Sequence, residues 1–384
     1  MKISAYYPNY FKDFGIAHAS YHVMKGMQSN HAEISLMGIT SDNIFSDSFY
    51  RDALPKWSKS LIYKALPDKA ILKIAESIFS RSLNENVDFA YLWPGISLST
   101  YQSIKKRGHQ IIFEGVNSPA GNIKQILDVE YDSLNLPAAH GIGQQQIDEE
   151  LARIALSDYV YSCNPTMRAN FEDIGVPKSN IINTSYGLSA SAILSDDHLK
   201  LQNRSQPATF LFVGSIGVRK GAHLLLDYWV KSHLNAKLIL VGTIEDALKP
   251  LVNQYLGDAS IVHIPFTSDL VSLYKNADVF ILPSLEEGSP LVTYLALGAG
   301  LPVIASPMGS GNIIADGVDG FVIEPHDENK WIDSMRLLSE DAALRQKLSQ
   351  QSKQKAFNYT WDVVGADRLN SLLKAEERKD KAKI

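Results

Sequence analysis

The chain has 384 residues, 45% of them hydrophobic, and its 37 lysines and arginines against 42 aspartates and glutamates give a formal net charge of −5. This length and apolar content favour two domains, and the acidic balance argues against general nucleic-acid binding. A single cysteine, Cys163, excludes an internal disulfide framework and suits a reducing cytosol. Because Pro8 comes too early for a signal peptide and no apolar run is long enough to cross a bilayer, we expect a cytoplasmic protein.

The first half of the chain alternates short apolar runs with amphipathic stretches. Strands are expected at residues 2–7, 32–39, 87–93, 110–116, 158–163 and 180–186, with helix-like stretches such as 18–28 and 149–156 between them. This alternation is typical of βαβ units around a parallel sheet. Residues 188–206 form a polar, interrupted segment before Pro207, which is typical of a linker.

Residues 54–73 form a basic amphipathic segment within that first half. They carry one acid, Asp68, against Lys56, Lys59, Lys64, Lys69 and Lys73, together with several apolar side chains. Pro67 prevents a single long helix here. The segment is either an ordinary solvated helical region with a core-facing stripe, or a surface that touches an anionic membrane.

The second half repeats the α/β pattern. Strands are expected at residues 209–214, 236–242, 260–266, 278–284, 301–306 and 320–325, with a helix at 221–230 after the first of them. We therefore predict an N-terminal domain over 1–187 and a C-terminal domain over 207–356, each an α/β, Rossmann-like, doubly wound domain. Ligands in such sheets lie at the carboxyl ends of the strands, so the cleft between two domains is the expected site.

The stretch "EEGSPLVTYLALGAGLPVI", residues 286–304, predicts a loop, a short helix and a buried strand. Ser289 suits the N-cap, Pro290 the first helical position and Gly300 the C-terminal exit. The start of such a helix directs unpaired N–H groups and a positive dipole end at the preceding loop, where an anion could bind. By itself, the stretch fits a buried helix without a ligand equally well.

Two further stretches suggest ligand-binding loops. In "FLFVGSIGVRKGAHLLLDYW" a strand reaches Gly214, and a loop then carries Arg219 and Lys220 to a glycine at the head of a helix. Such cations suit a diphosphate, although this is not a Walker A loop because a glycine follows Lys220. In "PVIASPMGSGN" a strand ends in a loop where Gly309 allows close approach of a ligand. Taken singly, a solvated charge pair and an ordinary turn explain these two stretches as well.

In combination, the three stretches resemble glycosyltransferase family 4, a retaining family with the GT-B fold. Three parts of the family pattern have counterparts here. "VGSIGVRKG" matches VG(R)xxxxKG, and "PSLEEGSPLVTYLALGAGLPVIASPMGSG" matches PSxxEGFGLVxLEAxAxGxPVIAxxxGG. "DGVDGFVIEP" matches DGxxGxLV. The resemblance covers most of the chain after about residue 145, and residues 1–145 match only in pattern. It implies two Rossmann-like domains facing across a cleft, with a terminal helix in 357–384 that crosses back to the first domain.

The resemblance implies a donor site around two catalytic residues. Lys220, with Arg219 beside it, should contact the donor diphosphate, and Glu287 should contact hydroxyls of the donor sugar. The other donor-binding positions that it implies are Gly15, Gly214, Ser215, Gly288, Ser289, Pro290, Leu291, Val292, Leu295, Gly309 and Ser310.

Two of these positions depart from the family pattern. Ser215 stands where the family often has an arginine, and Leu295 stands where it has the second carboxylate of a Glu-x7-Glu pair. That carboxylate usually accepts hydrogen bonds from the nucleotide ribose. Because one such bond is worth about 1.5–3 kcal/mol, its loss is expected to weaken donor binding about tenfold to a hundredfold.

The implied function is transfer of a sugar, with retention, from a nucleotide-diphosphate sugar to a glycan or lipid-linked glycan acceptor. Such a transferase would serve cell-surface polysaccharide or glycolipid synthesis in the cytoplasm, or peripherally on the inner face of the membrane, with no metal or other cofactor. Ser215 and Leu295 favour an alternative, a catalytically impaired GT-B protein that binds nucleotide or glycan or supports a partner transferase. A phosphorylase, which would carry pyridoxal phosphate, is a weaker third alternative.

Three N-domain residues are acceptor-side candidates. Glu114 and Asn117 lie at the end of an expected strand, where they would face the cleft. His18, with His22 nearby, follows Gly15 on the expected first helix. A packed or surface histidine is the more ordinary interpretation of His18 and His22.

Overall fold

The computed structural model describes residues 1–41, 45, 47–56, 59–195 and 207–381. The chain divides into two compact units. The first comprises Met1–Pro119, Gly143–Tyr186 and Trp361–Ile384, and the second comprises Ala120–Ile142 and Gly187–Thr360. Among the described residues, no helix is both long and apolar enough to span a membrane.

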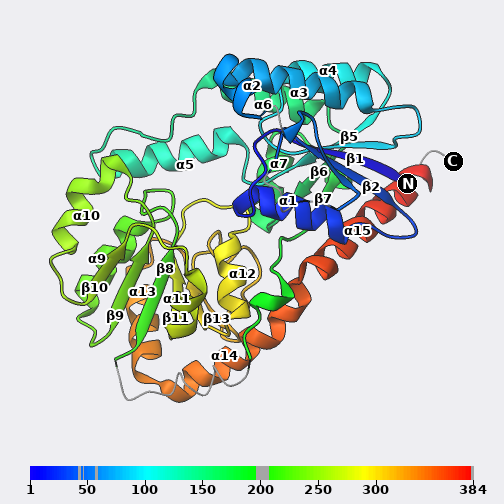
Figure 1. Ribbon diagram of the computed structural model, residues 1–384. Helices are drawn as coiled ribbons and strands as arrows, with labels where there is room; N and C mark the ends of the chain where they lie inside the picture. Colours follow the sequence, from blue (N-terminus) through cyan, green and yellow to red (C-terminus); the bar gives the residue numbers. More distant parts are fainter. Residues whose placement is uncertain (42–44, 46, 57–58, 196–206, 382–384) are drawn as a thin grey trace. The chain divides into compact units, whose positions relative to one another are not determined.

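The first unit is built on a parallel sheet. Within the described residues its strand order is β3-β2-β1-β4-β5-β6-β7. Figure 1 labels β1, β2, β5, β6 and β7 of this sheet. The strands are β1 (Lys2–Tyr7), β2 (Glu33–Gly38), β3 (Tyr50–Asp52), β4 (Phe89–Leu92), β5 (Gln110–Glu114), β6 (Tyr159–Ser162) and β7 (Ile181–Asn183). All six predicted strands are confirmed. The additional β3 is a three-residue edge strand, Tyr-Arg-Asp, with no apolar run to reveal it.

Helices connect these strands. They are α1 (Gly15–Gly26), α2 (Lys59–Ala65), α3 (Asp68–Ser82), α4 (Leu98–Lys106), α6 (Gln144–Ala155), α7 (Pro165–Asp173) and the C-terminal α15 (Trp361–Lys381). The terminal helix packs on α1 through two glycines. A Cβ on Gly26 would lie 2.4 Å from the carbonyl oxygen of Trp361, and a Cβ on Gly365 would lie 2.3 Å from the carbonyl carbon of Gly26. The predicted return of the terminal helix to the first unit is therefore confirmed.

The second unit has the same strand order. Its described residues form a parallel sheet in the order β10-β9-β8-β11-β12-β13, so both sheets show the 3-2-1-4-5-6 order of a doubly wound fold. The strands are β8 (Thr209–Val213), β9 (Lys237–Val241), β10 (Ile261–Ile264), β11 (Val279–Leu282), β12 (Val303–Ala305) and β13 (Gly320–Val322). The helices are α5 (Ala120–Ser133), α9 (Ala222–Ser232), α10 (Lys249–Tyr255), α11 (Leu270–Asn276), α12 (Leu291–Gly298), α13 (Glu328–Glu340) and α14 (Ala342–Ala356).

The unit boundaries differ from those expected from the sequence at α5, at the linker and at the terminal helix, which begins at Trp361 and not at residue 357. Helix α5 clusters with the second unit, although the predicted N-terminal domain ran unbroken to residue 187. Polar contacts hold it there, since Glu130 accepts a hydrogen bond from His223 Nε2 at 2.6 Å and Tyr131 donates to Glu245. The described start of the predicted linker also packs within this unit, where Leu194 N–H donates to the carbonyl oxygen of Gly298 at 2.9 Å. Residues 196–206 of that linker lie outside the described residues.

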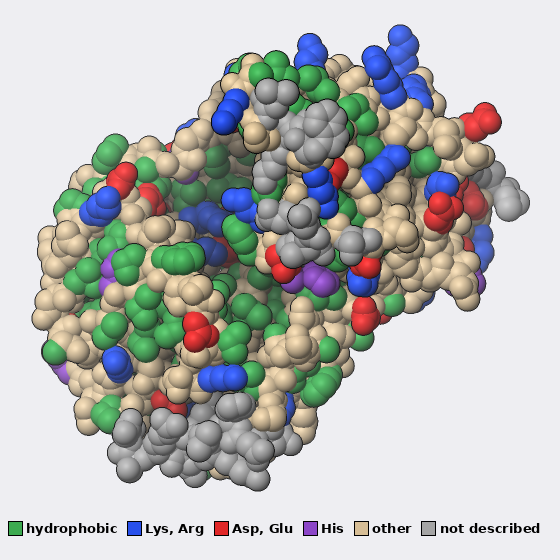
Figure 2. Space-filling model, in the orientation of Figure 1, with side chains coloured by type: hydrophobic (Ala, Val, Ile, Leu, Met, Phe, Trp, Pro, Cys, Tyr) green, Lys and Arg blue, Asp and Glu red, His purple; other side chains and the backbone are tan. Residues whose placement is uncertain are grey.

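The basic segment 54–73 contains the helix break predicted at Pro67. That residue caps α3, and α2 ends two residues before it. Lys64, Lys69 and Lys73 are exposed, as are the apolar side chains of Tyr63 and Leu66. On the face that Figure 2 presents, basic and acidic side chains are interspersed among neutral ones.

Candidate functional site

The candidate site of the second unit lies on the loops that follow β8, β11 and β12. The strand order of this sheet reverses between β8 and β11. Loops at the carboxyl ends of two such strands diverge and leave a crevice, which is where open parallel sheets bind ligands. The three sequence motifs occupy these loops, so the fold gathers them at one edge of the sheet.

Glycines allow two of these loops to approach a neighbouring strand end. Gly221 has a φ of +65°, and a Cβ there would lie 2.1 Å from the carbonyl oxygen of Pro283. A Cβ on Gly309 would lie 2.2 Å from the carbonyl oxygen of Leu282. No larger residue fits either position, because real Cβ atoms do not come so close to backbone oxygen. The loops are therefore held tightly against the end of β11.

Two cations and two carboxylates form a cluster at this edge. Lys220 Nζ contacts Glu287 Oε1, and Arg219 Nη2 lies 3.3 Å from the same oxygen. Arg219 Nη1 also lies 3.0 Å from Glu286 Oε2. Lys220 is 8% exposed, Glu287 6% and Glu286 0%. The fold thus brings together the two predicted catalytic residues, and it adds a carboxylate that the sequence interpretation missed.

The electrostatics of this cluster keep Glu287 ionised. Burial by itself would raise the pKa of the Glu287 carboxyl, but the nearby Lys220 and Arg219 outweigh that effect and lower it. Burial would lower the pKa of Arg219, and Glu287 and Glu286 raise it instead. Glu287 and Arg219 therefore keep their opposite charges at neutral pH.

Hydrogen bonds hold the loop after β12 against the same site. Ser306 Oγ accepts from Gly309 N–H at 2.9 Å and donates to the carbonyl oxygen of Ser284 at 2.5 Å. Thr293 Oγ1 donates to the carbonyl oxygen of Gly309 at 2.9 Å, which ties this loop to α12. Ser310, the other predicted donor-binding residue here, is buried and donates to the carbonyl oxygen of Pro307 at 2.8 Å.

The start of α12 differs by one residue from the prediction. We expected Ser289 as N-cap and Pro290 as the first helical residue, but Pro290 is the N-cap and the helix begins at Leu291. The Ser289 hydroxyl lies 2.6 Å from the Tyr294 hydroxyl, which takes the place of a capping bond. The predicted exit is confirmed, because Gly300 has a φ of +68° and its N–H donates to the carbonyl oxygen of Leu297.

Leu295, where the second family carboxylate is missing, lies on a half-buried face of α12. Leu291 and Val292 share this face by their helical spacing, and all three are only partly covered. Gly288 is buried, whereas Ser215, where the family often has an arginine, is exposed beside Gly214. A charged side chain at position 295 would therefore face a surface and not the core.

In the first unit, Gly15 begins α1 with a φ of +62° in the connection that follows β1. His18 lies on this helix, and its Nδ1 is 2.7 Å from Asp13 Oδ1. The His18 and His22 rings are 4.2 Å apart, and His22 stacks on Trp361. Burial and the neighbouring His18 lower the pKa of His22 to about 4, so its imidazole is neutral at physiological pH. One ligand atom from each of Asp13, His18 and His22 lies within 4.8 Å of the others, so these residues could hold a metal ion.

The structure corrects the expectation for Glu114. Its side chain is 0% exposed, and its carboxylate accepts hydrogen bonds from Arg368, Tyr91 and Tyr186. With both oxygens engaged inside the first unit, Glu114 holds α15 against the sheet and presents nothing to a ligand. Asn117 is half-buried in the loop after β5, a position still open to an acceptor role.

Comparison with known proteins agrees with the motifs. Residues 195–355 match the family model described as "Glycosyl transferases group 1", which confirms the resemblance over most of the second unit. A D-inositol 3-phosphate glycosyltransferase of Corynebacterium diphtheriae is 35% identical over 105 residues, covering 27% of this chain and 24% of that protein. The chain spans less than half the length of the curated relatives that it matches.

Solved structures show the same fold. WaaG, a glycosyltransferase involved in lipopolysaccharide biosynthesis, superposes with a TM-score of 0.67 at 14% identity, covering 97% of this chain and 99% of WaaG. Anabaena HepE in complex with UDP superposes with a TM-score of 0.66 at 15% identity, covering 98% of this chain and 100% of HepE. The chain therefore has the two Rossmann-like domains of GT-B glycosyltransferases, as the sequence predicts.

Proposed function

We propose that this protein is a retaining glycosyltransferase that moves a sugar from a nucleotide-diphosphate sugar to a glycan or lipid-linked glycan acceptor in the synthesis of a cell-surface polysaccharide or glycolipid. The observation that carries the proposal is the cluster of the half-buried Arg219 with the buried Lys220, Glu286 and Glu287 at the strand-order reversal of the second sheet. The match of this unit to group 1 glycosyl transferases supports it, and the complex of HepE with UDP supports the donor class.

Lys220 and Arg219 are the residues that hold the donor diphosphate in this proposal. An ammonium has three N–H donors and a guanidinium five, so both keep donors for phosphate oxygens while they contact the carboxylates. Because the four-residue cluster is close to neutral, backbone amides at the start of α12 and in the adjoining loops must share the charge of the diphosphate. Glu287, held between both cations, would accept hydrogen bonds from hydroxyls of the donor sugar.

The chemistry then needs no protein nucleophile. The bond between the anomeric carbon and the diphosphate oxygen breaks, and the acceptor oxygen bonds that carbon on the same face. The acceptor proton passes to the departing diphosphate oxygen. The cations and amides stabilise the negative charge that develops on the leaving group, which is where preorganised charge has its largest effect on rate. We propose that this occurs without a metal ion.

An impaired GT-B protein that binds nucleotide or glycan, or supports a partner transferase, is the second candidate function. The apolar Leu295 on the half-buried face of α12 favours it, because no carboxylate stands there to hold a ribose. Transfer and binding therefore have to be measured separately.

Calorimetric titration of the protein with UDP, GDP and ADP in the presence of EDTA tests the donor site first. We expect one of the three nucleotides to bind in the micromolar range, which corresponds to roughly −8 kcal/mol. Hydrolysis or transfer from the matching nucleotide sugar then separates an active from an impaired enzyme. A folded protein that binds none of the three would contradict the assigned site.

Restoring the missing carboxylate tests the significance of Leu295. We expect Leu295→Glu to tighten binding of the preferred nucleotide about tenfold, because a charged acceptor would become available to the ribose. Leu291→Glu, one helical turn earlier on the same face, adds the same charge and serves as the control. Equal effects of the two variants on the dissociation constant would show that only the added charge matters.

Peripheral contact with an anionic membrane surface through residues 54–73 is part of the proposal. The exposed Lys64, Lys69 and Lys73 beside exposed Tyr63 and Leu66 support it. Co-sedimentation with anionic vesicles tests it, since the variant with all three lysines changed to glutamate should stay in the supernatant. Equal pelleting of both proteins would exclude this contact.

A further inference from the structure

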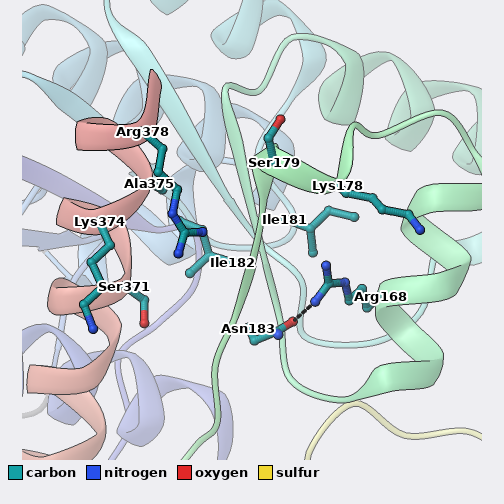
Figure 3. Close-up of a pocket in the computed structure, with 10 residues that line it drawn as sticks. All are labelled: Arg168, Lys178, Ser179, Ile181, Ile182, Asn183, Ser371, Lys374, Ala375 and Arg378. Carbon is teal, nitrogen blue, oxygen red and sulfur yellow. Dashed lines mark hydrogen bonds between the residues drawn. The ribbon is translucent and has the colours of Figure 1, made fainter. Parts of the chain in front are cut away.

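A basic pocket lies in the first unit, between α15 and the outer edge of the sheet. Its volume is about 230 Å³, and it is lined by residues of α7, β7, α15 and the segment before β7. Figure 3 shows Lys374 and Arg378 on α15 at one side of β7, and Arg168 and Lys178 at the other. The strand order of this sheet reverses between β1 and β4, and β7 is three positions beyond β4. The pocket is therefore separate from the strand-order reversal.

The described residues that line this pocket include four cations and no carboxylate. Glu172, which does not line the pocket, partly neutralises the positive charge of Arg168 and Lys178. Its carboxylate lies 3.0 Å from Arg168 Nε and 3.3 Å from Lys178 Nζ. In the described part of the chain no ion pair is formed by Lys374 or Arg378, and both are exposed. Like charges four residues apart on a helix repel each other, so the α15 side of the pocket favours an anion.

The donors of this pocket suit a phosphate. Two planar guanidinium groups match pairs of phosphate oxygens, and the two ammonium groups add point charges. Asn183 Oδ1 accepts a hydrogen bond from Arg168 Nη1 at 3.3 Å, which leaves the amide NH₂ of Asn183 to donate. The volume of the pocket also leaves room for a small substituent on the phosphate, such as glycerol.

We propose that this pocket binds the phosphate group of a phosphate monoester or diester. The phosphate belongs either to a soluble phosphorylated molecule or to a phospholipid headgroup, since both present the same oxygens. This site is independent of the proposed transferase function, because its residues belong to the first unit and the proposed donor clamp belongs to the second.

Hydrogen–deuterium exchange of the full chain can locate this binding. Peptides covering residues 178–183 and 371–378 are compared in glycerol 3-phosphate, in sodium chloride of equal ionic strength, and with phosphatidylglycerol or phosphatidylcholine vesicles. We expect phosphate-dependent protection of both segments. We also expect Lys374→Ala/Arg378→Ala to weaken the apparent affinity about tenfold to a hundredfold, because charge-assisted bonds are lost.

The controls separate this pocket from other anion sites. Lys106→Ala/Lys347→Ala removes the same charge from two exposed lysines outside the pocket and should leave protection unchanged. Lys220→Ala weakens the proposed donor site and should also leave it unchanged. Protection by glycerol 3-phosphate identifies a soluble ligand, and protection by either kind of vesicle alone identifies a lipid headgroup. Protection by neither, or protection that persists in Lys374→Ala/Arg378→Ala, would overturn the proposal.

Discussion

Replacing Lys220 by alanine is expected to lower kcat of sugar transfer about a hundredfold to a thousandfold, which is the usual effect of removing one preorganised donor from a developing negative charge. The Lys220 ammonium lies in the loop after β8, directly against Glu287, where the proposed diphosphate would depart. Nucleotide binding should weaken as well, because the same ammonium would contact the diphosphate before the reaction.

The fold of the Lys220→Ala variant should persist. Arg219 Nη2 remains 3.3 Å from Glu287 Oε1, so the buried carboxylate keeps a cationic partner. Steady-state kinetics, calorimetry and thermal unfolding are measured together to separate chemistry from stability. Lys231→Ala on α9 is the control, because this exposed lysine pairs with Asp227 and Glu328 away from the loops. Near-normal turnover in Lys220→Ala would remove Lys220 from the proposed mechanism.

Replacing Arg368 by methionine is expected to reduce the free energy of unfolding of the first unit by about 3–5 kcal/mol, as is typical when one partner of a buried ion pair is removed. Arg368 is 1% exposed, and its Nη1 lies 2.9 Å from Glu114 Oε2. Its Nε and Nη2 both donate to the carbonyl oxygen of Ser185, at 3.1 and 2.9 Å. Of the partners that the described residues give the buried Glu114 carboxylate, the variant keeps the Tyr91 and Tyr186 hydroxyls.

Urea denaturation, with hydrogen exchange in β4 and β5 to identify the unit that unfolds, measures this loss. Glu114→Gln/Arg368→Met should recover part of the stability, because it removes the unpaired charge. The matched control is Arg336→Met, where an exposed arginine pairs with Asp333 on the surface, and such pairs contribute at most about 1 kcal/mol. A loss of similar size in Arg368→Met and Arg336→Met would contradict the role of the buried pair.

The local features of the candidate site were predictable from the sequence. Strands buried on both faces produce the continuous apolar runs that predicted β8, β11 and β12. Gly221 and Gly309 mark places where a side chain would meet backbone oxygen, and Gly300 marks the end of a helix. These signals depend on residues adjacent in the chain, so a single sequence contains them.

The structure was needed for relationships between residues that are distant in the chain. From the sequence, Glu114 was an acceptor-side candidate. The fold instead places Arg368, which is 254 residues later in the chain, against it. Only packing decides whether a carboxylate at the end of a strand contacts a ligand or lies in the core. Glu286 became part of the site through Arg219, which lies 67 residues earlier.

The sequence by itself therefore determined the parallel α/β architecture and the loops that carry the motifs. It identified Lys220 and Glu287 as site residues only through the family resemblance. The tertiary structure decided which charges meet. It alone grouped α5 with the second unit and gathered the cations of α7 and α15 into one pocket. The physical reason is that secondary structure and tight turns follow from local periodicity and sterics, whereas charge pairing and burial depend on packing between segments far apart in the chain.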